Sequence, residues 1–334
     1  LTMNIPQKTL SLLAIASLST LSSLSAVETD PVGYITISCL GGSDTVTSVP
    51  LAETTSIVSA VASVDSGSSQ ITIDQNTLVV NDYQDSHYVR FGEGSALEGA
   101  KMTISANTAD TLTLDVQSGY NLGSVSVDDV VEIIPYITLS GLFASVSSIP
   151  DSTEVFFFDN ATNGINKSSS GGYIYYAPDW YDANTFAIVN DAVLFPDDAL
   201  IVRVPGDSSN DFDLINSGAV PTVGHSFPVV TAGSGANDNF IAPQVPGGVE
   251  LATLFSSAAD NDEILVFDNT VREQNKSSSG GYIYYAPNWY DAGTFAVVDT
   301  LKVNPWEMAV YRRAAQGGSS ATVFSGRASY LDNL

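Results

Sequence analysis

The sequence predicts an all-β protein: two related β-sandwich-like units in tandem, the first interrupted by a small inserted β-barrel. Three observations support this prediction. A passage of 24 residues occurs twice, apolar residues alternate with a period of two along most of the chain, and about 80 residues of the first unit have no counterpart in the second. A duplication of this length indicates two copies of one structural unit.

The duplicated passage spans Asn166–Val189 and Asn275–Val298, and 21 of its 24 paired positions are identical at an offset of 109 residues. A looser match continues outward, with Glu154–Asn160 paired with Glu263–Asn269 and Arg203 with Arg312. The predicted domains are a signal peptide at 1–26, a first unit at 27–56 and 137–221, an inserted barrel at 57–136, and a second unit at 222–334.

The first 26 residues have the pattern of an export signal. Lys8 provides a short positive region, an apolar, Ser-rich stretch follows, and small residues cluster before Ala26. Such a signal would direct the chain to export, and cleavage near Ala26 would release the mature protein. We therefore expect a secreted or cell-surface protein with no membrane span, since no later segment carries 18 or more apolar residues.

Strand signals follow one another along the mature chain. Residues of alternating polarity, rich in β-branched types, predict these strands: Tyr34–Ser38, Ile71–Asp74, Leu78–Val80, Met102–Ser105 and Thr111–Val116. A further strand, Thr185–Val189, is expected after the repeated aromatic motif. Val155–Phe158 and Ile264–Phe267 are apolar throughout, which is typical of strands covered on both faces. Short helices are expected only within Leu51–Val64 and Val249–Ala259.

The inserted stretch contains five or six short strands and a hairpin around Asn107–Asp110. About 80 residues of this kind suit a closed barrel, because closure removes exposed strand edges.

The repeated motif is rich in aromatic residues. Ala177–Pro178 should end a strand, and Trp180–Asp182 should form a corner before the next strand. Two interpretations compete: buried rings that pack the corner, or an exposed platform that stacks on sugars or anchors a partner. The candidate binding residues are Tyr173, Tyr175, Trp180, Tyr181, Tyr282, Tyr284, Trp289 and Tyr290.

The charge excludes some classes of function. The formal charge is −26, from 37 acidic and 11 basic residues, so the surface repels nucleic acid and anionic lipid. With 44% apolar content, disorder is disfavoured. The single cysteine, Cys39, allows no internal disulfide and is interpreted as a core residue.

Catalytic patterns are scarce, and we predict no catalytic residue. His87 and His225 lie in dissimilar contexts, Cys–His zinc sites are excluded, and carboxylate pairs cannot be judged from spacing. Calcium is the one cofactor considered. Oxygen ligands cluster weakly in 159–163 and at a second group of candidates, Asp207, Asn210, Asp211 and Asp213. Solvated acidic loops are the simpler interpretation.

Several passages resemble a known family. They are Asp30–Tyr34, Ser43–Thr45 with Val49–Leu51, Ala106–Leu114, and Phe158–Asn160 with Ile165–Ser168. Their order is similar to that of a family of uncharacterised exported proteins of the Verrucomicrobia–Planctomycetes group of bacteria. The resemblance implies export and a role at or outside the cell envelope, and it brings no activity, cofactor or catalytic residue.

The expected function is that of a secreted structural or interaction protein, whose partners are copies of itself in a filament or layer. Tandem similar units offer quasi-equivalent faces, and head-to-tail contacts between such faces propagate when they do not close. The alternative is a carbohydrate-binding module that uses the Tyr/Trp corners to bind extracellular polysaccharide.

Overall fold

The structure, a computed structural model, describes residues 30–304, 306, 308–317 and 320–333. It is nearly all β, with several sheets and one closed barrel of six strands, as the sequence predicts. The predicted signal peptide, residues 1–26, lies outside the described residues.

The barrel is built from strands of the inserted stretch in the order β3-β4-β7-β6-β5-β8. Their bounds are β3 Ile57–Asp65, β4 Gln70–Ile73, β5 His87–Phe91, β6 Lys101–Asn107, β7 Thr111–Leu114 and β8 Val130–Pro135. Apolar residues at alternate positions, such as Val61, Ile71 and Ile104, fill its interior. Two sequence predictions are wrong here: Leu51–Val64 contains β3 and no helix, and Leu78–Val80 forms no strand.

Unit 1 packs a five-stranded sheet, in the order β12-β11-β10-β15-β2, on the two-stranded ribbon β1–β16. The bounds are β1 Val32–Cys39, β2 Ser43–Thr47, β10 Glu154–Phe157, β11 Gly171–Tyr176, β12 Asp179–Asp182, β15 Leu200–Val204 and β16 Phe212–Ala219. Short pieces complete it: β9 Ile137–Thr138, α1 Leu139–Leu142, β13 Val193–Leu194, β14 Asp197–Asp198 and the 3-10 turn η2 Ser208–Asn210. Cys39 is fully buried in this core, and burial raises the pKa of its thiol to about 12.

Unit 2 repeats this plan with the sheet β18-β24-β20-β21-β22 and the ribbon β17–β25. The bounds are β17 His225–Thr231, β18 Asn237–Ala242, β19 Val249–Glu250, α2 Leu251–Leu254, β20 Glu263–Val266, β21 Gly280–Tyr285, β22 Asn288–Asp291, β23 Lys302–Val303, β24 Met308–Arg313 and β25 Ser320–Gly326. One turn of helix, α2, lies within the predicted Val249–Ala259, whereas its counterpart α1 in unit 1 was not expected.

The two units share their pairing register. Glu154 lies opposite Arg203 in unit 1, and Glu263 lies opposite Arg312 in unit 2, at the offset of 109 read from the sequence. The two ribbons also pair in equivalent registers. Tyr34 lies opposite Ser217 in unit 1, and His225 lies opposite Gly326, the counterpart of Ser217, in unit 2. The chain is thus a pseudo-symmetric pair of sandwiches within one polypeptide.

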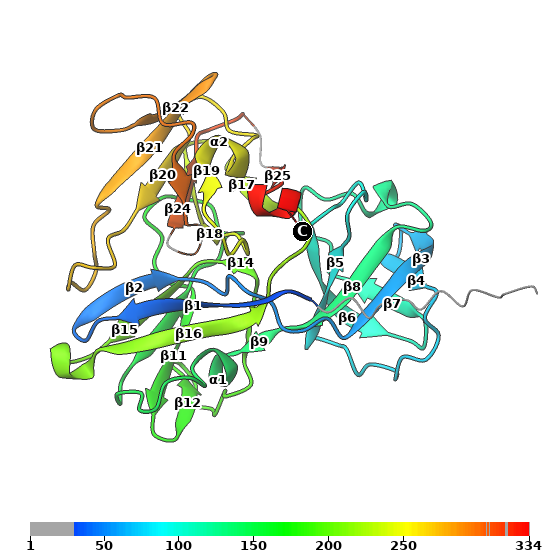
Figure 1. The fold of residues 1–334 in the computed structure, drawn as a ribbon, viewed down its shortest axis with the longest axis horizontal. Helices are drawn as coiled ribbons and strands as arrows, with labels where there is room; N and C mark the ends of the chain where they lie inside the picture. The colour runs from blue at the N-terminus through cyan, green and yellow to red at the C-terminus, as the bar shows by residue number, and fades with distance from the viewer. Residues whose placement is uncertain (1–29, 305, 307, 318–319, 334) are drawn as a thin grey trace, which may run out of the picture.

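The three parts lie against one another (Figure 1). The barrel stands beside the two stacked units, β14 of unit 1 extends the sheet of unit 2, and the C-terminus lies between the barrel and unit 2. Close approach at this junction requires glycine, because a Cβ on Gly99 would collide with the carbonyl of Gly224. The inserted barrel, which interrupts unit 1, therefore packs on the ribbon of unit 2.

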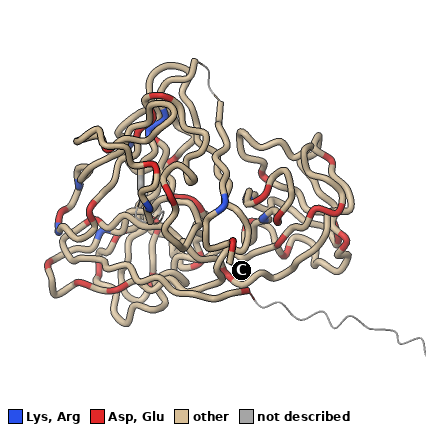
Figure 2. The backbone as a smooth tube through the Cα atoms, turned by 45° about the horizontal axis from the view of Figure 1, so that its top comes forward, with Lys and Arg blue, Asp and Glu red and all other residues tan. Residues whose placement is uncertain are grey.

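Acidic residues are spread over all three parts, with the few basic residues among them (Figure 2). The net charge of −26 opposes binding to nucleic acid, which requires clustered positive charge. Within the described residues, no helix has the length and apolar character needed to cross a membrane.

Candidate functional site

The repeated motif folds as the same tight hairpin in both units. Strand β11 runs to Tyr176, two residues turn the chain, and β12 starts at Asp179, with Tyr176 opposite Asp179. Ala177–Pro178 and its counterpart Ala286–Pro287 both have cis peptide bonds. The predicted corner at Trp180–Asp182 is wrong, since these residues continue a strand paired with β11.

The chain then returns without forming the predicted strand Thr185–Val189. Asp182 accepts hydrogen bonds at Oδ1 from the Thr185 amide and hydroxyl, at 2.7 and 2.9 Å, and these bonds lower the pKa of its carboxyl. The turn places Phe186 in the left-handed region at φ 55°, and Phe295 of unit 2 adopts φ 57°. Such a conformation is unusual for an aromatic residue, and both units retain it.

Strand alternation separates the candidate aromatic residues into two groups. Trp180 and Trp289 are 2% and 1% exposed and lie in the cores of the two units. Tyr173, Tyr175, Tyr282 and Tyr284 pack against the same cores. The rings of Trp180 and Phe143 lie 4.7 Å apart, so the indole faces are covered by protein. A platform built from the two tryptophans is therefore contradicted by their burial.

The remaining two candidates, Tyr181 and Tyr290, lie on the face away from the cores, next to Tyr176 and Tyr285, which are not among the sequence-based candidates. We call the resulting surfaces end face 1, made of Tyr176, Tyr181, Phe186 and Ile188, and end face 2, made of Tyr285, Tyr290, Phe295 and Val297. Phe186 is 63% exposed and Phe295 is 62% exposed. In end face 2, the ring centroids of Tyr285 and Phe295 lie 6.5 Å apart.

The end faces lie far apart. In Figure 1, the hairpin β21–β22 is at the top of the two-unit body and the hairpin β11–β12 is at its bottom. The hairpins that carry the two copies of this surface therefore lie at opposite ends of the two-unit body. Alternation along β11 predicts that Tyr176 lies on the face of the sheet away from Tyr175. The exposure of Phe186, in contrast, depends on its positive φ, and no local sequence pattern predicts that conformation.

A second repeated feature lies between the units, where each sends a loop onto the edge strand of the other. Asn160, after β10, accepts from the Phe240 amide at 2.7 Å and donates to the Phe240 carbonyl at 3.0 Å. Asn269, after β20, does the same with Val46, at 2.9 and 2.8 Å. Each asparagine side chain thereby extends the partner sheet as an added strand would.

Ion pairs complete both contacts in the same way. Arg312 binds Asp238 at 2.7 Å, and the Asp238 carboxylate also accepts from the Asn166 amide at 2.6 Å. In the mirrored contact, Arg203 binds Asp44 at 2.7 Å, and Asp44 accepts from the Asn275 amide. The edges of β2 and β18 are thus occupied within the chain, which removes them as places for strand addition between copies.

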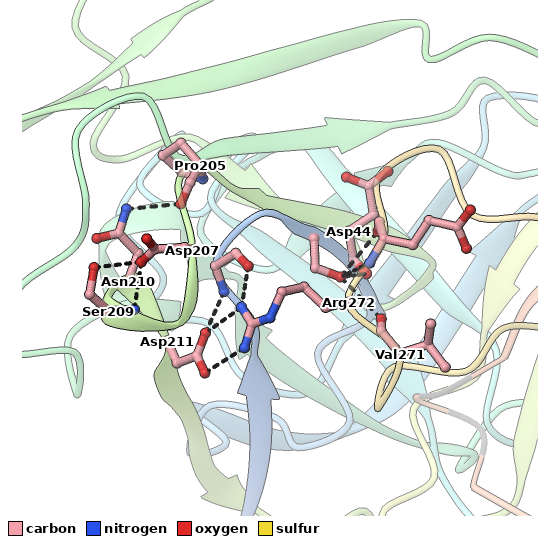
Figure 3. Close-up of polar contacts among 11 residues, drawn as sticks. Asp44, Pro205, Asp207, Ser209, Asn210, Asp211, Val271 and Arg272 are labelled. Atoms are coloured by element: carbon pink, nitrogen blue, oxygen red, sulfur yellow. Dashed lines mark hydrogen bonds and ion pairs between the residues drawn. The ribbon is translucent and has the colours of Figure 1, made fainter.

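One contact breaks this symmetry (Figure 3). Arg272 stands where unit 1 has Asn163, and its guanidinium binds both oxygens of Asp211 at 2.8 and 2.9 Å as well as the Gly41 carbonyl. The ion pair lowers the pKa of Asp211 to about 2.

The side chains proposed as calcium ligands make hydrogen bonds or ion pairs with neighbouring residues. Asp207 accepts from the Ser209 amide and hydroxyl, Asn210 donates to the Pro205 carbonyl, and Asp213 accepts from Ser38. In the second cluster, Asp159 accepts from Ala161 and Thr162. Among the described residues, no group of three or more His, Cys, Asp or Glu side chains is arranged to hold a metal ion.

The two histidines lie apart and in different settings. His87 is half-buried in the barrel, where Ser86 lies 2.8 Å from its Nδ1. His225 is 3% exposed beneath the barrel, and burial, aided by Lys101, lowers its pKa to about 4. We find no nucleophile–base–acid arrangement at either ring in the described part of the chain.

In comparisons with known proteins, no family model, curated protein or solved structure matches the chain. The resemblance to exported proteins of the Verrucomicrobia–Planctomycetes group stays a prediction, as do secretion and the absence of an enzymatic activity.

Proposed function

We propose that this protein is a secreted structural protein of the cell surface or matrix that assembles end to end through its two end faces. The observation that carries the proposal is the pair of exposed aromatic surfaces at opposite ends of one molecule. Phe186 and Ile188 are 63% and 60% exposed, and their counterparts Phe295 and Val297 are 62% and 56% exposed. Exposed apolar groups gathered in this way favour contact with another apolar surface.

The duplicated passage supports this interpretation. Packing explains why the two copies keep Trp180 and Trp289, since both fill cores. It does not explain why they keep exposed phenylalanines in a left-handed conformation. A surface role for Phe186 and Phe295 does, because a shared contact would require the same side chain in the same place.

The geometry sets the form of the assembly. A molecule with one adhesive surface binds once and stops, whereas one with two equivalent surfaces pointing apart forms an open chain. The net charge of −26 opposes association, so assembly should increase with ionic strength as repulsion is screened.

The test uses variants that block one end or both. Electron microscopy and light scattering of mature protein should show chains, Phe186→Ala and Phe295→Ala should each stop at dimers, and the double variant should stay monomeric. Trp180→Ala serves as the contrast, because it should lose about 3–5 kcal/mol of folding stability, whereas the phenylalanine variants keep theirs within about 0.5 kcal/mol. A monomeric wild type at all salt concentrations, or chains from the double variant, would contradict the proposal.

Polysaccharide binding is the second candidate, favoured by the clustered open rings of end face 2, where Tyr290 and Phe295 lie 6.3 Å apart. It predicts that monomeric protein binds a glycan and that the single variants lose avidity. Sedimentation with insoluble polysaccharide at low salt distinguishes the two functions.

A further inference from the structure

A cavity of about 400 Å³ lies where the barrel and both units meet. The barrel contributes Lys101, Tyr120 and Tyr136, unit 1 contributes the turn that holds Asp197 and Asp198, and unit 2 contributes Phe227 and Pro228. None of the residues of the end faces lines it. The cavity therefore exists only because three parts of the chain come together, and its role is independent of the proposed assembly.

Most polar groups in its wall are paired with one another. Lys101 binds Asp197 at 2.8 Å, and the Thr103 hydroxyl lies 2.7 Å from the Tyr136 hydroxyl. The Tyr120 hydroxyl lies 3.2 Å from Ser226 Oγ. The charge of Lys101 is thus already neutralised, and these groups need no ligand.

Asp198 is the exception. It lines the cavity, and its carboxylate has no hydrogen bond or ion pair with any of the residues that the structure describes. Its backbone is held in β14 opposite Ile241. Burial, together with the neighbouring Asp197, raises the pKa of Asp198 to about 7. A carboxylate that has no cationic partner favours a positively charged ligand, because an opposite charge nearby stabilises the ionised form.

Aromatic rings form much of the remaining wall. Tyr136 and Phe195 meet at 5.2 Å, and Phe158 stacks on Phe240 at 3.7 Å beside the same cavity. The faces of such rings attract cations, most strongly where water is excluded. A wall of aromatic rings around one unpaired carboxylate suits a positive group that carries apolar substituents.

We propose that this cavity binds a small organic cation, an amine whose ammonium group pairs with Asp198 and whose carbon atoms contact the aromatic wall. A bare divalent metal ion fits less well, since calcium requires six to eight oxygen ligands, whereas Asp197 in this wall is already paired with Lys101 and Asp159 already accepts hydrogen bonds from Ala161 and Thr162. A neutral sugar would leave the carboxylate without a counter-charge.

The experiment compares choline with its neutral isostere 3,3-dimethylbutan-1-ol, which has the same shape and no charge, and with glucose. Binding to the full-length mature protein is measured by titration calorimetry in dilute buffer. We expect choline to bind and the isostere to bind about tenfold more weakly or not at all. Asp198→Asn, which keeps the shape of the side chain, should weaken choline binding about tenfold or more.

Asp74→Asn is the matched control, because Asp74 is exposed on the barrel and its loss removes the same charge elsewhere. Thermal unfolding of each variant reports that it is folded. Equal binding of choline and its isostere, unchanged binding by folded Asp198→Asn, preference for glucose, or no choline binding at millimolar concentration would each overturn the proposal.

Discussion

The two ribbons occupy equivalent places in the two units, yet one faces solvent and the other is buried. Tyr34 on β1 is 75% exposed, whereas His225, at the same position of β17, is 3% exposed. The barrel makes this difference, because Glu98 accepts from the Gly224 amide at 2.9 Å and Tyr120 reaches Ser226. An insertion in one copy of a duplicated fold has thus changed the environment of the other copy.

The cores differ as well. Unit 1 places Thr153, Val202 and Val204 where unit 2 places Asp262, Tyr311 and Arg313. Asp262 has no exposed surface and binds Arg313 at 2.5 Å and the Tyr311 hydroxyl at 2.6 Å. One sandwich therefore tolerates an uncharged or an ionic group at the same depth, where the buried carboxylate and guanidinium bind each other.

The largest expected effect comes from breaking that ionic group. Asp262→Ala leaves the Arg313 guanidinium buried without its anion, and should lower the free energy of unfolding by about 3–5 kcal/mol. Thr153→Ala, the matched change in unit 1, removes one hydrogen bond to Pro150 and should cost about 1 kcal/mol. Urea denaturation measures both. Equal losses would show that the two cores are energetically alike.

The covered ribbon should add a pH dependence that the exposed one lacks. His225 has a pKa of about 4 in the folded chain and about 6.5 unfolded, so the unfolded state takes up the proton first as pH falls. The contribution of neutral His225 to the free energy of unfolding is fully present above pH 6.5, and about 3 kcal/mol is lost as the pH falls from 6.5 to 4. Unfolding of wild type and His225→Asn across this range gives the histidine contribution by difference.

Tyr34→His provides the control for that measurement. A histidine on the exposed ribbon should titrate as it does in the unfolded chain, and should leave the pH dependence of stability unchanged. If Tyr34→His behaved like His225, cover by the barrel would not be the cause of the effect.

A smaller effect is expected where the units are equivalent. Asn160→Ala and Asn269→Ala each leave a backbone amide and carbonyl of the other unit without their partner, and each should cost about 1–3 kcal/mol. Denaturant titration of both variants should give losses of similar size. A large inequality would show that one of the two loop contacts dominates the interface.

Local periodicity and repetition in the amino-acid sequence were enough to predict part of this fold. Alternation with a period of two predicts β1, β4, β6 and β7, because successive side chains of a strand point to opposite faces, and continuous apolar runs predict β10 and β20. The offset of 109 residues likewise predicts the equivalence of Arg203 and Arg312. The inserted strands also form the closed barrel that their length and spacing suggested.

Contacts between distant parts of the chain decided the rest. Tryptophan and phenylalanine are both apolar, so composition could not show that Trp180 is buried while Phe186 is exposed. Trp180 is covered by Phe143, which follows α1, whereas Phe186 is exposed in a turn where its backbone is left-handed. The unpaired carboxylate of Asp198 has no sequence signal either, since its surroundings come from three separate segments. Desolvation and pairing depend on which surfaces meet, and that is settled only when the units and the barrel pack together.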